Sequence, residues 1–317
     1  MASLLLNERA FHMAEQMIGD AGALRIAVHC TNAGATLLDC GIHAEGGVHA
    51  GLAMARVCMA DLGSVALVPG DIGGIPCPYV QVTTDHPVLA CMASQYAGWQ
   101  IKVGRYFAMG SGPMRAAYGK EELFGHIPGK EQPGTAVGVL ETRKLPDDDV
   151  IAYLHERTNV PASEIVLLAA QTASHAGNLQ VVARSVEMAL HKLHELKFDL
   201  TKVVAGHGVA PLPPVAKDDL AAMGRVNDAI IYGGRVVLWV RADDEEIAAV
   251  GPKVPSTSSA DYGSLFRELF HRSGGDFYKM DADLFSPAQV AFASLRSGRT
   301  QVFGMPNPDT VRRSFYE

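Results

Sequence analysis

The stretch SEIVLLAAQTASHAGNLQVVARSVEMALHKLHEL, residues 163–196, contains the pattern on which the fold of this chain depends. It opens with an uninterrupted apolar run that is typical of a buried strand. A loop of small, uncharged polar residues follows, and a helical pattern then continues to Leu196. Open α/β sheets usually bind ligands where their strands end. We therefore expect Thr172 and Ser174, which lie in this loop, to contact a ligand.

Two charged residues, Arg184 and Glu187, lie three positions apart in the helical pattern. Residues at this spacing share one face of a helix. The opposite face carries an apolar stripe made of Val182, Val186, Ala189, Leu190, Leu193 and Leu196. Spacing alone leaves two interpretations open. The pair is either a surface ion pair worth about 0–1 kcal/mol, or a carboxylate and a guanidinium that project into a substrate cleft.

The rest of the chain predicts an α/β fold with two domains. Strand patterns occupy residues 24–30, 35–41, 64–69, 79–84, 99–104, 136–143, 235–240 and 300–304. Helical patterns lie between them, and one is predicted over 286–298. A length of 317 residues suits two domains. The best linker candidate is GHIPGKEQPGT at 125–135. It predicts an N-terminal α/β domain over 1–130 and a C-terminal α/β domain over 131–317, and the second domain carries the helix of Arg184 and Glu187. Individual segments are free to cross between the two domains.

A second candidate site follows the predicted strand that begins at Tyr106, where the sequence reads GSGP before a helical pattern. Glycines let the backbone approach a ligand closely, and a helix N-terminus offers unpaired N–H donors. Ser111 and Arg115 would then hold a polar or anionic group. The alternative is an ordinary tight turn, because the pattern matches no known phosphate-binding loop.

A third candidate group, Lys217, Asp219 and Arg225, follows a proline-rich loop. Charges in such a pattern usually form a solvated helix face. Their position beside the loop makes substrate contact the alternative.

Composition and missing motifs exclude several classes of function. The formal net charge is −7 and no run of lysine and arginine exceeds two residues, which disfavours a nucleic-acid partner. Five cysteines without a C-x-x-C pair favour a reducing compartment, and no apolar run is long enough to span a membrane. Zinc motifs and the G-x-S-x-G elbow are absent, and His175 has no metal-ligand set around it. Acid–base chemistry on a small organic molecule is the class that best fits what is left.

Three long segments carry a resemblance to a known family: YFAMGSGPMRAA, QTASHAGNLQVVARSVEMALHKLHEL and VAKDDLAAMGRVNDAIIYGG, together with HCTNAGATLLDCGIHAEGG near the N-terminus. In this order they resemble methenyltetrahydromethanopterin cyclohydrolases. The resemblance implies reversible hydrolysis of the 5,10-methenyl cation of a tetrahydromethanopterin-type C1 carrier to its 5-formyl derivative. It also implies a homotrimer whose two-domain α/β subunits bind a pterin in a cleft between the domains, and the cysteine content favours a cytoplasmic location. No metal or other cofactor is expected, since the substrate is itself a C1-carrier coenzyme, and neither is a nucleic-acid or membrane partner.

The same resemblance implies roles for the charged pair of the first stretch. Glu187 matches the catalytic glutamate of the family, and Arg184 matches the arginine three residues before it. We expect Glu187 to act as general base and then acid, and Arg184 to orient it. Two rival hypotheses are a non-catalytic pterin-binding protein and a structural subunit whose Arg184–Glu187 pair lies in an oligomer interface.

Overall fold

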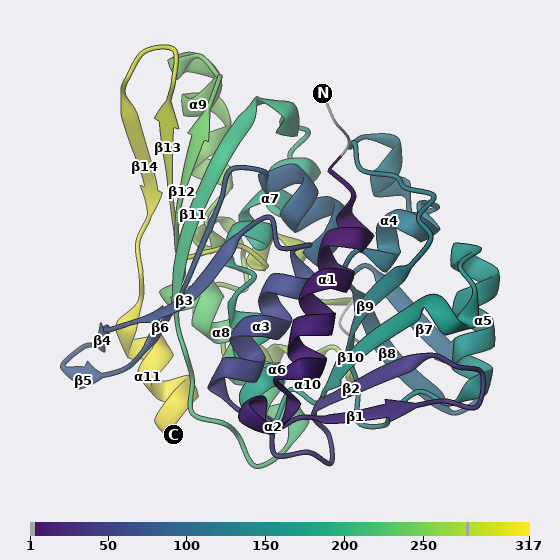
Figure 1. The fold of residues 1–317 in the computed structure, drawn as a ribbon. Coiled ribbons are helices and arrows are strands. Elements are labelled where there is room, and N and C mark those ends of the chain that lie inside the picture. The colour runs from purple at the N-terminus through teal and green to yellow at the C-terminus, as the bar shows by residue number, and fades with distance from the viewer. Residues whose placement is uncertain (1–3, 277–278) are drawn as a thin grey trace. The chain divides into compact units, whose positions relative to one another are not determined.

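The computed structural model describes residues 4–276 and 279–317 and divides into two compact units (Figure 1). Unit 1 comprises the chain up to residue 63 together with 88–180, and unit 2 comprises 64–87 together with 181–317. Each unit contains one six-stranded sheet with helices. The predicted α/β fold class is therefore confirmed.

The two units alternate along the chain, whereas the sequence pattern suggested a boundary near residue 130 and allowed segments to cross it. Residues 131–180 lie in unit 1 because strands β9 (Ala136–Glu141) and β10 (Ile165–Ala170) pair within its sheet. Residues 64–87 lie in unit 2 because β3 (Ser64–Val68) and β6 (Tyr79–Thr84) pair within the other sheet. A segment rich in glycine and proline indicates a loop, but strand pairing between residues distant in sequence decides which unit a segment belongs to.

The sheet of unit 1 has the order β1-β2-β10-β9-β8-β7. Its other strands are β1 (Ala27–Cys30), β2 (Thr36–Gly41), β7 (Trp99–Val103) and β8 (Tyr106–Ser111). The three central strands β2, β10 and β9 run parallel, and the remaining pairs are antiparallel. The carboxyl ends of β9 and β10 consequently meet at one edge, where the loop after β10 begins.

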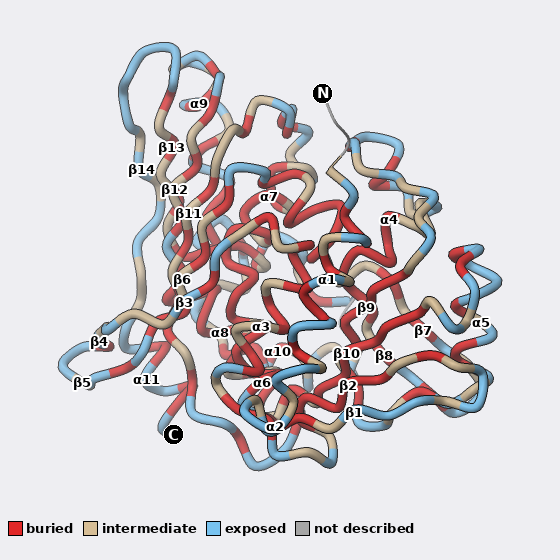
Figure 2. The backbone as a smooth tube through the Cα atoms, in the orientation of Figure 1, coloured by how far each residue is buried: buried red, intermediate tan, exposed pale blue. Residues whose placement is uncertain are grey.

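Apolar cores cover both faces of this sheet. Every residue of β10 is buried (Figure 2), because alternate side chains enter opposite cores. On one side Leu168 packs with helices α1 (Leu6–Gly19) and α3 (Val48–Cys58); on the other, Leu167 packs with α5 (Asp148–Thr158). The unit also contains α2 (Ala21–Leu24), a π-helix (Val88–Gln95), α4 (Met114–Tyr118) and α6 (His175–Val182), whose last two residues belong to unit 2.

The sheet of unit 2 has the order β14-β13-β12-β11-β6-β3 and is mostly antiparallel, with β12 and β13 parallel. Its further strands are β11 (Val203–Pro211), β12 (Arg235–Val240), β13 (Gln289–Ser294) and β14 (Thr300–Gly304), and a small hairpin is formed by β4 (Asp71–Ile72) and β5 (Ile75–Pro76). The helices are α7 (Ser185–Glu195), α8 (Asp219–Gly233), α9 (Asp244–Val250), α10 (Phe266–Arg272) and α11 (Pro308–Tyr316).

One face of this sheet supports α7, and the other carries a half-exposed apolar row. A side chain at Gly206 of β11 would meet Val186 of α7, so the even-numbered residues of β11 face that helix. The odd-numbered His207 faces the other way and pairs across the sheet with Val237 of β12. The row continues from Val237 through Ala291 to Val302, which is 56 % exposed.

The prediction of a helix over 286–298 is wrong, because this segment contains β13. Val290 and Phe292 are fully buried, and Ala291 between them is only half-buried, which is the two-residue period of a strand. Pairing with β12 on one side and β14 on the other outweighs the helix-favouring alanines of the segment.

Candidate active site

The segment carrying Arg184 and Glu187 contains two helices, so the prediction of one long helix is wrong. Helix α6 ends at Val182 and α7 begins at Ser185. The Arg184 amide donates to the carbonyl of Val181, three residues back, at 3.1 Å, which tightens the chain into a turn. The Arg184 carbonyl then accepts from Met188 at 2.8 Å and starts the hydrogen-bond ladder of α7. Arg184 is therefore the N-cap residue of the second helix.

This break places Glu187 in the first turn of α7, at the positive end of the helix. Glu187 is 5 % exposed and Arg184 is 7 % exposed, and each has polar or electrostatic interactions within the protein. An exposed ion pair, one of the two interpretations of the spacing, does not fit this burial. A buried carboxylate is costly unless a cation or hydrogen-bond donors accompany it, and the first turn of a helix offers such donors.

Close packing on β11 fixes the start of α7. An added side chain at Gly208 would lie 2.4 Å from Ser185 Oγ, and one at Gly206 would lie 2.7 Å from Val186 Cγ1. Only glycine at these two positions lets the first turn of α7 lie so close to the strand. The predicted apolar stripe of the helix is confirmed, since every member is fully buried except the half-buried Leu196.

The opposite end of α7 is tied to the same unit by a lysine. Lys192 is 2 % exposed, and its Nζ donates to the Asp283 carboxylate at 2.5 Å and to the Asp283 carbonyl at 3.2 Å. Rigid attachment at both ends holds a side chain at a defined position, which acid–base catalysis requires.

In unit 1, Thr172 and Ser174 follow β10, as predicted, at the carboxyl edge of the parallel strands. The Thr172 hydroxyl donates to the carboxylate of Glu141, the last residue of β9. Ser174 Oγ donates to the Gln171 carbonyl at 2.8 Å and accepts from Gly177 N at 3.0 Å, so it caps the start of α6. Sequence reasoning missed Glu141, because the strand pattern gave no sign that its last residue would meet the next strand's loop. Contact of Thr172 and Ser174 with a substrate stays a prediction.

Ser111 and Arg115 lie inside unit 1 and already have protein partners. Ser111 Oγ donates to the Val139 carbonyl at 3.2 Å. The fully buried Arg115 guanidinium binds both carboxylate oxygens of Glu121 at 2.9 and 2.6 Å and donates to the Met92 carbonyl at 2.8 Å. These contacts account for both residues as structural groups, which favours the tight-turn alternative for this stretch.

Lys217 and Arg225 line a hollow of about 390 Å³ in unit 2, which we call the α8 hollow; its wall includes Lys217, Arg225, Asp228, Arg267, Ser314 and Glu317. Asp219 is the first residue of α8 and is 9 % exposed. The structure thus brings two of the three predicted charges to one hollow. A substrate role for all three stays a prediction.

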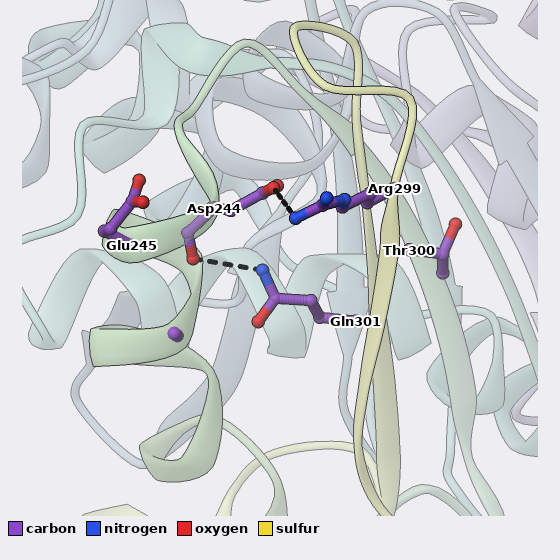
Figure 3. Close-up of a pocket in the computed structure, with 6 residues that line it drawn as sticks. Asp244, Glu245, Arg299, Thr300 and Gln301 are labelled. Atoms are coloured by element: carbon purple, nitrogen blue, oxygen red, sulfur yellow. Dashed lines mark hydrogen bonds and ion pairs between the residues drawn. The ribbon is translucent and has the colours of Figure 1, made fainter.

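A second, wider hollow of about 520 Å³ lies between α9 and β14 (Figure 3). Two of its three charged residues pair with each other, since Arg299 contacts the Asp244 carboxylate at 3.4 Å, and Gln301 Nε2 donates to the Asp244 carbonyl at 3.0 Å. No predicted site residue contributes to its lining. Across residues 4–276 and 279–317, no three His, Cys, Asp or Glu residues gather in a way that would hold a metal ion.

Comparison with known proteins gives a consistent result. The family described as "Cyclohydrolase (MCH)" matches residues 5–315. A protein of Rhodopirellula baltica named methenyltetrahydromethanopterin cyclohydrolase is 49 % identical over 290 residues, which cover 90 % of this chain and 87 % of the relative. Proteins with the same name from Methanosarcina barkeri and a Methylobacterium species are 42 % and 44 % identical, and each comparison covers 98 % of this chain and 97–98 % of the relative. Within the described residues, no helix has the length and apolar character needed to cross a bilayer.

Proposed function

The chain belongs to the cyclohydrolase (MCH) family, and we propose that it catalyses reversible hydrolysis of the 5,10-methenyl cation of a tetrahydromethanopterin-type C1 carrier to the 5-formyl derivative. The observation that supports this proposal most directly is the buried pair Arg184–Glu187 at the start of α7. A pterin is the small-molecule partner that the names of the relatives imply.

The proposed reaction needs one well-placed base. The bridging carbon of the cation lies between two nitrogens and is already electrophilic. As the oxygen of a water molecule bonds to this carbon, Glu187 accepts a proton from the water and a neutral hydroxyl adduct forms. The bond from this carbon to one nitrogen then breaks, Glu187 returns its proton to the departing nitrogen, and the hydroxyl proton leaves to solvent as the formyl group forms. One proton is released for each water consumed.

We propose that Arg184 is a positioning residue for Glu187. It lies one turn before Glu187, and its backbone starts the helix that carries the carboxylate. A neighbouring cation favours the ionised carboxylate that must accept the first proton. The negative charge of Glu187 also attracts the cationic substrate more than the neutral product, which assists product release in the hydrolytic direction.

The test is a direct spectroscopic assay with Glu187→Gln. Wild-type protein should abolish the absorbance of the methenyl group, and the variant should lose about 10²–10⁴-fold in kcat, the usual contribution of a positioned general base. Glu195→Gln is the matched control, because Glu195 lies on the same helix and is exposed. A kcat near the wild-type value for Glu187→Gln would overturn the assigned role. A change of oligomeric state without a kinetic defect would instead support an interface role for the pair.

Arg184→Ala and the presence of EDTA extend the same assay. Loss of the positioning group should lower kcat, whereas a modest rise in KM alone would make Arg184 a binding residue. We expect full activity with EDTA, because the electrophilic carbon needs no Lewis acid to polarise it. Inactivation by the chelator, reversed by added metal, would contradict this expectation.

We further propose that the chain forms a homotrimer through the half-exposed face of the unit 2 sheet that carries this apolar row. The apolar row Val237–Ala291–Val302 on that face is half-exposed or exposed in the single chain. Apolar side chains in such a row are typical of surfaces that another protein covers. Light scattering should give about three times the subunit mass of 33.8 kDa, and Val237→Asp should lower this mass. A monomeric wild type would refute the proposal.

A cytoplasmic location is proposed on the state of the cysteines. All five lie in the described residues and none is joined in a disulfide, and four of them, Cys40, Cys58, Cys77 and Cys91, are buried. Buried cysteines outside disulfides are typical of proteins from reducing compartments. Fractionation of cells that express the chain would test this location.

A further inference from the structure

The α8 hollow gathers three cationic side chains from different parts of unit 2. Lys217 comes from the loop before α8, Arg225 from α8 itself and Arg267 from α10. A volume of about 390 Å³ lies within the range of small-molecule sites. The hollow is therefore large enough to receive a ligand group rather than one water molecule.

In the described residues, no protein carboxylate forms a close ion pair with these three cations. Arg225 donates to the Pro214 carbonyl at 3.1 Å, and neither Lys217 nor Arg267 has an ion-pair partner in residues 4–276 and 279–317. Cations elsewhere in unit 2 do have such partners. Arg296, for example, contacts both oxygens of Asp243 at 2.9 and 2.8 Å. Three cations without close ion pairs around one hollow, among the described residues, are unexpected in a chain whose formal net charge is −7.

The acidic groups of the hollow offset only part of this positive charge. The Asp228 carboxylate is 1 % exposed and accepts hydrogen bonds from Phe266 N at 2.9 Å and Ser314 Oγ at 2.6 Å. Burial raises the pKa of Asp228 to about 7, although its two hydrogen bonds and the Arg267 guanidinium act to lower it, so this carboxyl is partly protonated near neutral pH. Glu317 is the other acid that lines the hollow.

We propose that the α8 hollow is a binding site for an oxyanion, either a phosphate or a carboxylate group, held by Lys217, Arg225 and Arg267. Arginine side chains match the geometry of such anions with two parallel N–H donors, and lysine adds a compact charge. The same chemistry fits a free anion from solution or an anionic group on the C1 carrier. The second source rests on the proposed function, and the first does not.

Calorimetric titration with sulfate tests the site without any substrate, and sulfate keeps its charge across the neutral range. Ionic strength is held constant with sodium chloride, so that only specific binding is measured. Wild-type protein should bind sulfate, Arg267→Gln should weaken binding about fivefold, and Lys217→Gln with Arg267→Gln should weaken it at least about tenfold. Arg272→Gln is the matched control, because Arg272 lies on the same helix and contacts Ser264 instead of the hollow.

Two results would overturn the proposal: no sulfate binding by the wild type beyond that of chloride, or equal binding by the wild type and the double variant. If sulfate binds, the KM of Arg267→Gln for the methenyl substrate identifies the source. An anionic group on the carrier predicts a raised KM and competitive inhibition by sulfate. A free anion predicts an unchanged KM. Because the titration uses no substrate, a chain that fails to hydrolyse the methenyl cation would refute the proposed function and leave the sulfate result valid.

Discussion

The buried carboxyl of Asp228 predicts an unusual pH dependence of stability in unit 2. It joins three helices, because it lies on α8, accepts from Phe266 N at the start of α10 and accepts from Ser314 Oγ on α11. Replacement by asparagine keeps the size and one acceptor oxygen but removes the titration. The Ser314 hydroxyl can rotate to accept from the new amide, so Asp228→Asn should fold.

The sign and size of the effect follow from the raised pKa. The pKa is about 7 in the folded protein, against an ordinary value of 3.8. The folded state therefore holds this proton more tightly than the unfolded state, and the stability that the protonated group provides is lost as pH rises from about 4 through about 7. Linkage gives a loss of about 3 kcal/mol in the free energy of unfolding between pH 5 and pH 8. Asp228→Asn should not show this loss.

The chain offers a specific reporter for this measurement. It has two tryptophans, Trp99 on β7 in unit 1 and Trp239 on β12 in unit 2. In a Trp99→Phe background, urea unfolding followed by fluorescence reports on unit 2 through Trp239. The quantity of interest is the wild-type stability minus that of Asp228→Asn at each pH, because other titrating groups cancel in this difference.

The difference should fall steadily between pH 5 and pH 8. Asp309→Asn on α11 is the control, since its side chain is 89 % exposed and it should leave the pH profile of the wild type unchanged. A difference between wild type and Asp228→Asn that stays constant within about 0.5 kcal/mol would refute the raised pKa. The same result would mean that Asp228 is ionised near neutral pH, which would weaken the argument for the anion site.

Two further predictions concern unit 1. Arg115→Met should lower the free energy of unfolding by about 3–5 kcal/mol, because the substitution leaves the Glu121 carboxylate without its buried partner. Urea unfolding followed through Trp99 fluorescence measures this loss, and a loss below about 1 kcal/mol would contradict the prediction. Asp39→Asn should cost about 2 kcal/mol at pH 7, because the carboxylate accepts from four consecutive backbone amides. Burial opposes ionisation of Asp39, but these hydrogen bonds outweigh the effect of burial and lower the pKa of the carboxyl. The stability that the Asp39 carboxylate contributes should therefore be lost as pH falls into the acid range. Equal acid sensitivity of Asp39→Asn and the wild type would refute this contribution.

Short-range pattern was enough to predict many strands. The predicted segments 79–84, 235–240 and 300–304 match β6, β12 and β14 at both ends. Each is a short run with strand-forming residues, bounded by residues that favour turns. The apolar run before Gln171 was likewise a strand, and the polar loop that contains Ser174 follows its carboxyl end.

Features that depend on partners distant in sequence were not predictable. The segment 286–298 contains alanine and glutamine, which suit helices, and only its place between β12 and β14 makes it a strand. The contact between Thr172 and Glu141 joins residues 31 positions apart. The α8 hollow likewise brings Arg225 together with Arg267 and Ser314, which lie far along the chain from it. The division into units required knowledge of strand pairing, which local composition does not contain.

The pairing of Arg184 with Glu187 was inferred from helical spacing, yet the helix assumed for it does not exist in that form. A continuous helix would place both residues in its interior, where every backbone amide is already bonded. The observed break makes Arg184 an N-cap and puts Glu187 among the first amides of α7, which have no partner within the helix. The spacing rule still holds because the Arg184 carbonyl begins the new ladder. The buried carboxylate of Glu187 therefore lies at the positive end of α7, a surrounding that an uninterrupted helix would not have provided.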